Sequence, residues 1–183
     1  MKGIIFNLLE QAVCRTHGDD SWDDLLDAAH LRGAYTSVGS YPDEDLTKLV
    51  TAAVQSFQMP ADEIVRWFGR EALPLLAEKH PNFFAGHSST RSFLMTLNDI
   101  IHPEVRKIYP GAMVPQFDYD TTSSQRVLVI GYRSTRLLCA LAAGLIDGAA
   151  AHYGETVRVE QSQCTKREDP VCEFRITFHA AEA

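Results

Sequence analysis

Three side chains that can bind an anion stand at alternate positions in one short stretch of the chain. Tyr132, Ser134 and Arg136 belong to the string V-I-G-Y-R-S-T-R. In an extended segment, residues i, i+2 and i+4 point to one face, so a phenol, a hydroxyl and a guanidinium can converge on one anionic group. The planar fork of Arg136 can bind a carboxylate through two hydrogen bonds. The same spacing also fits an alternative in which Ser134 caps a helix that starts near Thr135 and Arg136 pairs with a surface acid.

One histidine upstream of this motif is a candidate metal ligand. His102 stands in N-D-I-I-H-P-E-V and follows an apolar pair, whereas the other six histidines lie beside charged, turn or terminal residues (His17, His30, His80, His87, His152 and His179). Pro103 should clash with the carbonyl of Asp99 and disfavour helical geometry at His102. The sequence therefore predicts a strained helix at this histidine. The alternatives are an ordinary surface or core histidine and a tolerated proline kink.

The segments that must position these residues are helical in the first part of the chain. Apolar stripes between turn residues predict helices over Lys2–Thr16, Trp22–Leu31, Asp43–Phe57 and Pro60–His80. A further helix bears His102, because apolar residues recur at helical spacing (Leu94, Leu97, Ile101, Val105 and Ile108), and Pro110-Gly111 ends it.

The pattern changes to a strand period after this helix. Residues 113–119 and 126–132 are predicted strands, 136–153 a helix, and two further strands follow, of which 171–178 alternates apolar and polar residues. Helices followed by β-β-α-β-β indicate an α+β domain.

Length, charge and cysteine content narrow the class of protein. A chain of 183 residues fits one domain that can bury a cofactor. A formal net charge of -7 without a basic run argues against nucleic acid and anionic membranes as partners. The N-terminal apolar stretch is broken by Asn7 and Glu10, so we expect neither a signal peptide nor a membrane helix and predict a cytoplasmic protein. Four cysteines form no disulfide-dense pattern and are expected to be thiols or metal ligands.

Motifs along nearly the whole chain resemble one known family. They are the opening M-K-G-I-I-F-N-L-L-E, W-D-D-L-L, Y-T-S-V-G-S-Y-P-D-E-D-L, R-W-F-G-R, N-D-I-I-H-P-E-V, I-Y-P-G-A-M-V-P-Q-F and Y-R-S-T-R. In this order and spacing the chain resembles the H-NOX family of bacterial haem nitric oxide and oxygen binding domains, which are related to the haem domain of soluble guanylate cyclase.

The resemblance implies a fold and a way of holding haem b. It implies a single H-NOX domain over 1–183, with an N-terminal helical subdomain over about 1–60 packed on a haem-holding subdomain over about 61–183 that contains a four-stranded antiparallel sheet. Haem would be buried between the two, with His102 as axial ligand to the iron. Tyr132, Ser134 and Arg136 would bind the propionates, and Pro115 would press on the haem face.

The resemblance also implies which residues form the gas side of the pocket. An apolar wall is expected from Ile5, Leu9, Pro74, Leu141 and Leu145, with Phe6 or Phe83 as further candidates. Ala140 would occupy the position where oxygen-binding relatives place a tyrosine. Bound oxygen gains from a hydrogen-bond donor that NO does not need, so we expect selection of NO, weaker binding of CO and exclusion of oxygen. The alternative is that another tyrosine reaches the iron.

The implied activity is signalling without catalysis. NO would weaken the iron bond to His102, the subdomains would rotate, and a separate signalling protein, a histidine kinase or a cyclic-di-GMP enzyme, would respond. A haem enzyme is the competing class, but no distal His-Arg pair suited to acid–base work is apparent in the sequence.

A second site is implied by three cysteines. Some relatives hold zinc with residues matching Cys139, Cys164 and Cys172 and a histidine where this chain has Gln161, which is a poor zinc ligand. A three-cysteine zinc site and a zinc or thiol redox sensor therefore remain as alternatives, beside three small core residues. Cys14 has no assigned role.

Overall fold

The first part of the chain forms four helices. The computed structural model describes residues 1–120 and 124–179. Its first elements are α1 (Gly3–His17), α2 (Asp20–Ala29), α3 (Asp43–Phe57) and α4 (Ala61–Lys79). Acidic side chains occupy the first turns of α2, α3 and α4, where they interact favourably with the positive end of the helix dipole. The predicted bounds of α3 match the structure.

The second part alternates short helices with strands. It contains the 3-10 turn Pro81–Phe83, α5 (Thr90–Leu94), the π-helical turn η2 (Leu97–Ile101), α6 (His102–Ile108), β1 (Gln116–Asp120), β2 (Val127–Arg133), α7 (Cys139–His152), β3 (Val157–Gln163), the 3-10 turn Thr165–Arg167 and β4 (Cys172–Phe178). The predicted single helix around His102 is thus three shorter pieces. α7 begins later than predicted, because Leu137 has a left-handed backbone with φ 53°.

Within the described residues, the four strands form one antiparallel sheet in the order β1-β2-β4-β3. Alternate residues of its two central strands are fully buried, among them Leu128, Ile130, Phe174 and Ile176. Arg175 on the opposite face is exposed, as the period-2 pattern predicts. The α+β fold class is confirmed.

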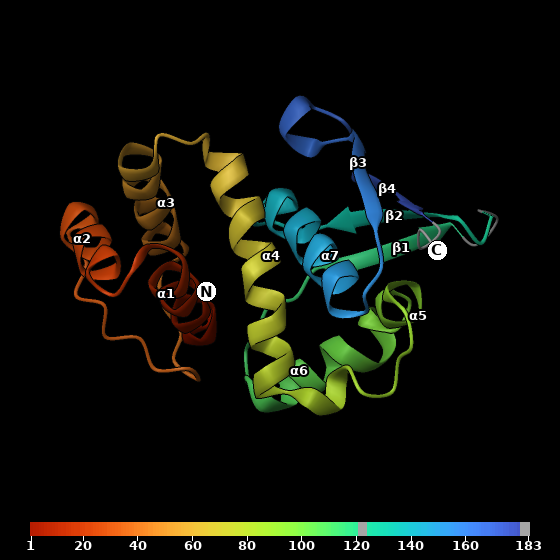
Figure 1. Cartoon of the computed structure of the whole chain (residues 1–183), viewed down its shortest axis with the longest axis horizontal. Coiled ribbons are helices and arrows are strands. Elements are labelled where there is room, and N and C mark those ends of the chain that lie inside the picture. Colours follow the sequence, from red (N-terminus) through yellow and green to blue (C-terminus); the bar gives the residue numbers. More distant parts are fainter. Residues whose placement is uncertain (121–123, 180–183) are drawn as a thin grey trace.

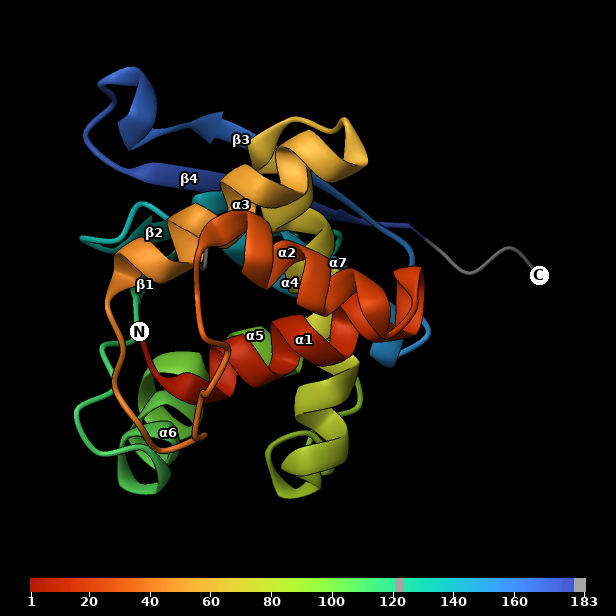
Figure 2. The ribbon, with the colours of Figure 1, turned by 90° about the vertical axis from the view of Figure 1, so that its left-hand side faces the viewer.

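Helix α4 stands between the N-terminal helices and the rest of the molecule (Figure 1). α1, α2 and α3 lie on one side of it, and α7 with the sheet lies on the other, an arrangement that the rotated view also shows (Figure 2). One buried apolar cluster joins α1, α2 and α3 to α4, and a second joins α7 to the sheet and to α5.

The contact between α4 and α7 depends on glycines. A Cβ atom on Gly144 would lie 1.9 Å from the backbone oxygen of Arg66, and one on Gly69 would lie 2.5 Å from the backbone oxygen of Leu141. The two backbones therefore approach closely only because these positions lack side chains. This contact determines where α7 lies relative to α4, and thus which α7 residues face the interior.

Candidate functional site

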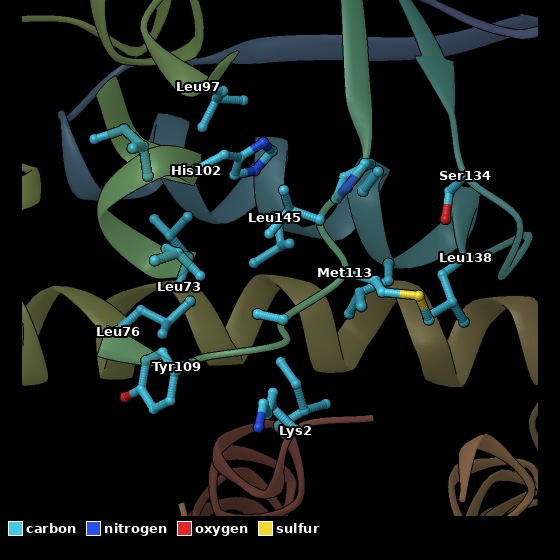
Figure 3. Close-up of a pocket in the computed structure, with 18 of the residues that line it drawn as sticks. Lys2, Leu73, Leu76, Leu97, His102, Tyr109, Met113, Ser134, Leu138 and Leu145 are labelled. Carbon is cyan, nitrogen blue, oxygen red and sulfur yellow. The ribbon is translucent and has the colours of Figure 1, made fainter. Parts of the chain in front are cut away.

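A largely apolar cavity of about 480 Å³ lies between α1, α4, α6, α7 and the loop after α6. In Figure 3, His102 projects from α6 at one side, Ser134 and Leu138 lie at the other, and Leu145 lies between them. The apolar lining includes Ile5, Leu73, Leu76, Phe83, Leu97, Val105, Pro115, Leu141 and Leu145. Polar groups are contributed by a few residues, among them His80, His102, Tyr109, Tyr132, Ser134 and Arg136.

A π-helical turn precedes His102 directly. The carbonyl of Thr96 accepts a hydrogen bond at 3.1 Å from the N–H of Ile101, five residues further on. Pro103 lacks an N–H and cannot continue the α-helical ladder. His102 nevertheless keeps helical angles, with φ -65° and ψ -36°. The prediction that Pro103 would displace His102 from helical geometry is therefore wrong, because the irregularity is taken up in the turn before it.

The sheet holds this turn in place. The side chain of Asn98 donates to the backbone oxygen of Phe117 at 2.6 Å and accepts from its N–H at 3.1 Å. The ring of Phe117 stacks on His102 with centroids 5.8 Å apart. The imidazole is therefore held by a strand as well as by its own helix.

The imidazole of His102 is half-buried, neutral and incompletely hydrogen-bonded. Its Nδ1 atom is buried and has no partner among the described residues. Burial lowers the pKa of His102 to about 4; the charge of Arg106 adds to this shift, and the nearby Pro115 backbone opposes it. A neutral imidazole with an unsatisfied nitrogen can act as a metal ligand at physiological pH.

A second cavity histidine is already engaged. The charged neighbours of His80 in the sequence do not indicate a metal ligand, yet this residue lines the cavity. Its Nε2 atom is hydrogen-bonded to the hydroxyl of Tyr109 at 3.0 Å. Burial lowers the pKa of His80 as well. The free nitrogen makes His102 the better candidate ligand of the two.

The three predicted anion-binding residues all line the cavity, although only Tyr132 belongs to a strand. Burial raises the pKa of Tyr132, and a hydrogen bond with Ser134 opposes that shift. Ser134 Oγ accepts from the backbone N–H of Arg136 at 3.2 Å. That bond lies outside any helix, since α7 begins only at Cys139, and it turns the chain so that the guanidinium reaches the cavity.

The guanidinium of Arg136 has a carboxylate partner from the N-terminal helices. Its Nε atom donates to Asp43 Oδ2 at 2.6 Å, and Nη1 donates to the Met113 carbonyl at 3.0 Å. The alternative in which Arg136 pairs with an acid is thus partly correct, but the pair lies beside the cavity. No local sequence signal indicated Asp43, which is 93 residues away.

The apolar wall of the cavity agrees only in part with the predicted one. Ile5, Leu141, Leu145, Phe83 and Pro115 line the cavity. Leu9, Pro74 and Ala140 are not among its lining residues.

Each of these three residues lies elsewhere. Leu9 is buried in the core around α1, and Pro74 is on the exposed face of α4. Ala140 is buried on α7, and it is the next residue, Leu141, that faces the cavity. Phe6 packs against Tyr35, with ring centroids 4.1 Å apart, and does not line the cavity either.

The family model described as haem-NO-binding matches residues 2–161 of this chain. The chain belongs to the haem-NO-binding (H-NOX) family. It is 30% identical to an H-NOX protein from S. oneidensis solved in the Fe(II)NO ligation state, with 98% of this chain and 100% of that chain covered at a TM-score of 0.91. It is 31% identical to the IWP-051-bound H-NOX from Shewanella woodyi in the Fe(II)CO state, with 100% and 97% covered at a TM-score of 0.83.

An unliganded Fe(II) H-NOX protein from K. algicida shares the fold at 23% identity, with 100% of this chain and 99% of that chain covered and a TM-score of 0.87. The family resemblance predicted from the motifs is therefore confirmed. In the described part of the chain, no helix combines the length and apolarity needed to cross a membrane.

The cavity of this H-NOX chain fits a haem. The buried Nδ1 of His102 lacks a partner, which marks that imidazole as the group able to ligate iron. Tyr132, Ser134 and Arg136 supply donors at another part of the wall, where propionates need them. The remaining lining is mainly apolar, as burial of a macrocycle requires.

A second cluster in this H-NOX domain consists of three thiols. The Sγ atoms of Cys139, Cys164 and Cys172 all lie within 4.8 Å of one another and are buried, and Cys139 and Cys164 are 3.8 Å apart. Burial raises the pKa of Cys139 to about 11. Burial acts in the same direction on Cys164, but hydrogen bonds from the Lys166 backbone and the other two thiols lower its pKa overall.

Stability of the haem-free domain should depend on the titration of His102. Its pKa is about 4 when folded against an ordinary value of 6.5, so the unfolded chain binds the proton more tightly, and stability is lost as pH falls between these values. We expect a loss of about 2 kcal/mol, allowing for partial exposure of the ring. Urea unfolding at pH 7 and pH 4 should show this loss in the wild type. The loss should be smaller by about this amount in His102→Gln, in which other groups such as His80 and Asp43 still titrate, and equal losses in the two proteins would contradict the assignment.

Proposed function

We propose that this chain is a haem-based gas sensor without catalytic activity. It binds NO, and CO more weakly, and excludes oxygen. The supporting observation is the pairing, in one apolar cavity, of an imidazole with an unpartnered buried nitrogen and a cluster of three anion-binding side chains. Membership of the H-NOX family and the NO- and CO-ligated structures of its relatives support the same role.

In this proposal each group of residues has one task. Haem b, when bound, would supply a ferrous iron that takes diatomic gases. His102 would hold the iron, and Tyr132, Ser134 and Arg136 would hold the propionates. Pro115 lies on the cavity wall beside His102, whose pKa its backbone affects, and would shape the haem face.

Oxygen exclusion rests on the composition of the gas-side wall. Ile5, Leu141 and Leu145 offer no hydrogen-bond donor, and a polar ligand gains about 1.4 kcal/mol, or about tenfold in affinity, from one such bond. Tyr109 lines the cavity, but its hydroxyl is bonded to His80 at 3.0 Å. The apolar side chain that supports oxygen exclusion is thus Leu141 and not Ala140.

Signalling would act on a separate protein. We propose that the whole chain is one H-NOX domain and that release of His102 rotates the helices of about residues 1–60 against the remainder. The change would be read by a histidine kinase or a cyclic-di-GMP enzyme in the cytoplasm. The arrangement favours this because α6, which begins at His102, packs mainly on η2 and lines the cavity through His102 and Val105.

The absorption spectrum of the reduced protein tests the function. We expect a Soret band that is unchanged between anaerobic buffer and air and that shifts on addition of NO. As matched controls, Leu141→Tyr should acquire an oxygen-bound spectrum in air, whereas Leu141→Phe, which has the ring without the hydroxyl, should not. A stable oxygen-bound spectrum of the wild type would contradict oxygen exclusion, and no Soret band after reconstitution would contradict the haem assignment.

A second candidate function is supported by the thiol cluster. Three buried Sγ atoms within 4.8 Å of one another are close enough to hold one zinc ion or to form a thiol redox switch. Gln161 stands nearby with a buried amide nitrogen that has no hydrogen-bond partner among the described residues, and it does not supply the usual fourth zinc ligand. Loss of signalling on replacement of Cys164, but not of His102, would favour this function over gas sensing.

A further inference from the structure

One ion pair connects the start of α3 directly to the wall of the cavity. Arg136 Nε donates to Asp43 Oδ2 at 2.6 Å. The second carboxylate oxygen of Asp43 accepts from the α-amino group of Met1, and Met1 also lines the cavity. The Arg136 side chain is 15% exposed and that of Asp43 43%, so solvent screens the pair from the Asp43 side while the guanidinium is largely shielded.

This contact favours the ionised form of the Asp43 carboxyl group. The hydrogen bond from Arg136 lowers the pKa of the carboxyl group, burial opposes the shift, and the Met1 amino group adds to it. The carboxylate is therefore ionised at neutral pH. A guanidinium has five N–H groups in a rigid fork, and the bonds to Asp43 and to Met113 use two of them. Arg136 can hold Asp43 and still donate to an anion in the cavity.

The Asp43–Arg136 pair joins two parts of the fold. Asp43 is the first residue of α3, and α1 and α3 pack against the rest of the molecule mainly through α4. The Asp43–Arg136 pair provides a separate connection, from α3 to the segment between β2 and α7. Figure 2 shows the beginning of α3 on the same side of the molecule as the N-terminus.

We infer that Asp43 is a positioning residue that links α3 to the haem propionates through Arg136. This inference rests on the proposed function, because it assumes that haem occupies the cavity. One guanidinium is shared by a carboxylate of the N-terminal helices and a carboxylate of the cofactor. Movement of either carboxylate therefore changes the geometry available to the other, and the coupling is reciprocal.

Hydrogen exchange measures this coupling without reference to signalling. Amide exchange over residues 43–47 is compared in the haem-free protein, in the protein reconstituted with haem, and in the protein reconstituted with haem dimethyl ester, whose propionates carry no charge. In the wild type, haem should slow exchange at these amides by at least about fivefold. Haem dimethyl ester should not, although it should still protect the amides of α6.

Two variants separate a specific link from general stabilisation. Asp43→Asn should lose the haem-dependent protection of residues 43–47 and keep that of α6. The matched control is Asp147→Asn, because Arg66 Nε donates to Asp147 Oδ2 at 2.7 Å in a similar pair between α4 and α7, and neither residue is among those that line the cavity. This control should retain the full haem effect at residues 43–47.

The outcomes are distinguishable. If haem dimethyl ester protects residues 43–47 as well as haem does, or if Asp43→Asn keeps the protection, the inference is overturned while the proposed function stands. The comparison of the two haems uses the wild-type chain, so it holds even if a variant folds poorly. A wild-type chain that takes up no haem overturns both the proposed function and this inference.

Discussion

Replacing His102 by glycine should weaken haem binding by at least about 100-fold, because changes even to the outer shell of a metal site cost about 10- to 100-fold. The substitution removes the cavity imidazole that has a free buried nitrogen. It also leaves a space of matching shape beside Phe117, which stacks on the ring. Free imidazole should enter this space and restore haem binding. Titration of the apoprotein with haem, with and without imidazole, measures both effects.

The matched control is His80→Gly, which removes the other cavity histidine. That ring is bonded to Tyr109 at 3.0 Å, so its loss should disturb the contact between the ends of α4 and α6 and leave the ferrous spectrum unchanged. Imidazole should have no effect on this variant. If His80→Gly lost haem and His102→Gly kept it, the ligand assignment would be wrong.

Gly144→Ala should lower the free energy of unfolding by about 3 kcal/mol or more. The added Cβ would lie 1.9 Å from the backbone oxygen of Arg66. Backbone atoms cannot move aside as the end of a flexible side chain can, so α4 and α7 would have to separate. Because α7 carries Leu141 and Leu145 into the cavity, haem affinity should fall as well. Chemical denaturation of the apoprotein measures the loss of stability.

Gly86→Ala is the control for this substitution. No atom lies within 4 Å of a Cβ added at Gly86, and its backbone does not require a positive φ. Its stability should stay within about 0.5 kcal/mol of the wild type. Equal losses in the two variants would show that the contact between α4 and α7 is looser than the structure has it.

Local periodicity predicted most of the fold. The bounds of α3 and the alternation along β4 depend on residues close in sequence, and both match the structure. The gas-side wall was harder to predict, because successive residues of a helix are about 100° apart around its axis. Leu73 and Leu141 face the cavity, whereas their neighbours Pro74 and Ala140 do not. An error of one residue therefore changes the predicted chemistry of the wall.

Pairs of distant residues gave no signal in the sequence. Asp43 and Arg136 are 93 residues apart, and His80 and Tyr109 are 29 apart. Each pair forms only when the helices pack. Asp43 was correctly placed near the start of a helix, but such an acid is typical of any first turn. Its second role depends on the tertiary structure alone.

The π-helical turn before His102 adds one residue to the helix without turning this side chain to another face. Such a turn contains one residue more than an α-helical turn. Deletion of one residue from Leu97–Ile101 would restore a regular helix with the imidazole on nearly its present face, because the wider turn absorbs the extra residue locally. Homologues of different length can therefore be compared at this position only after the extra residue has been located, since an alignment without that correction would pair His102 with a residue on another face of the helix.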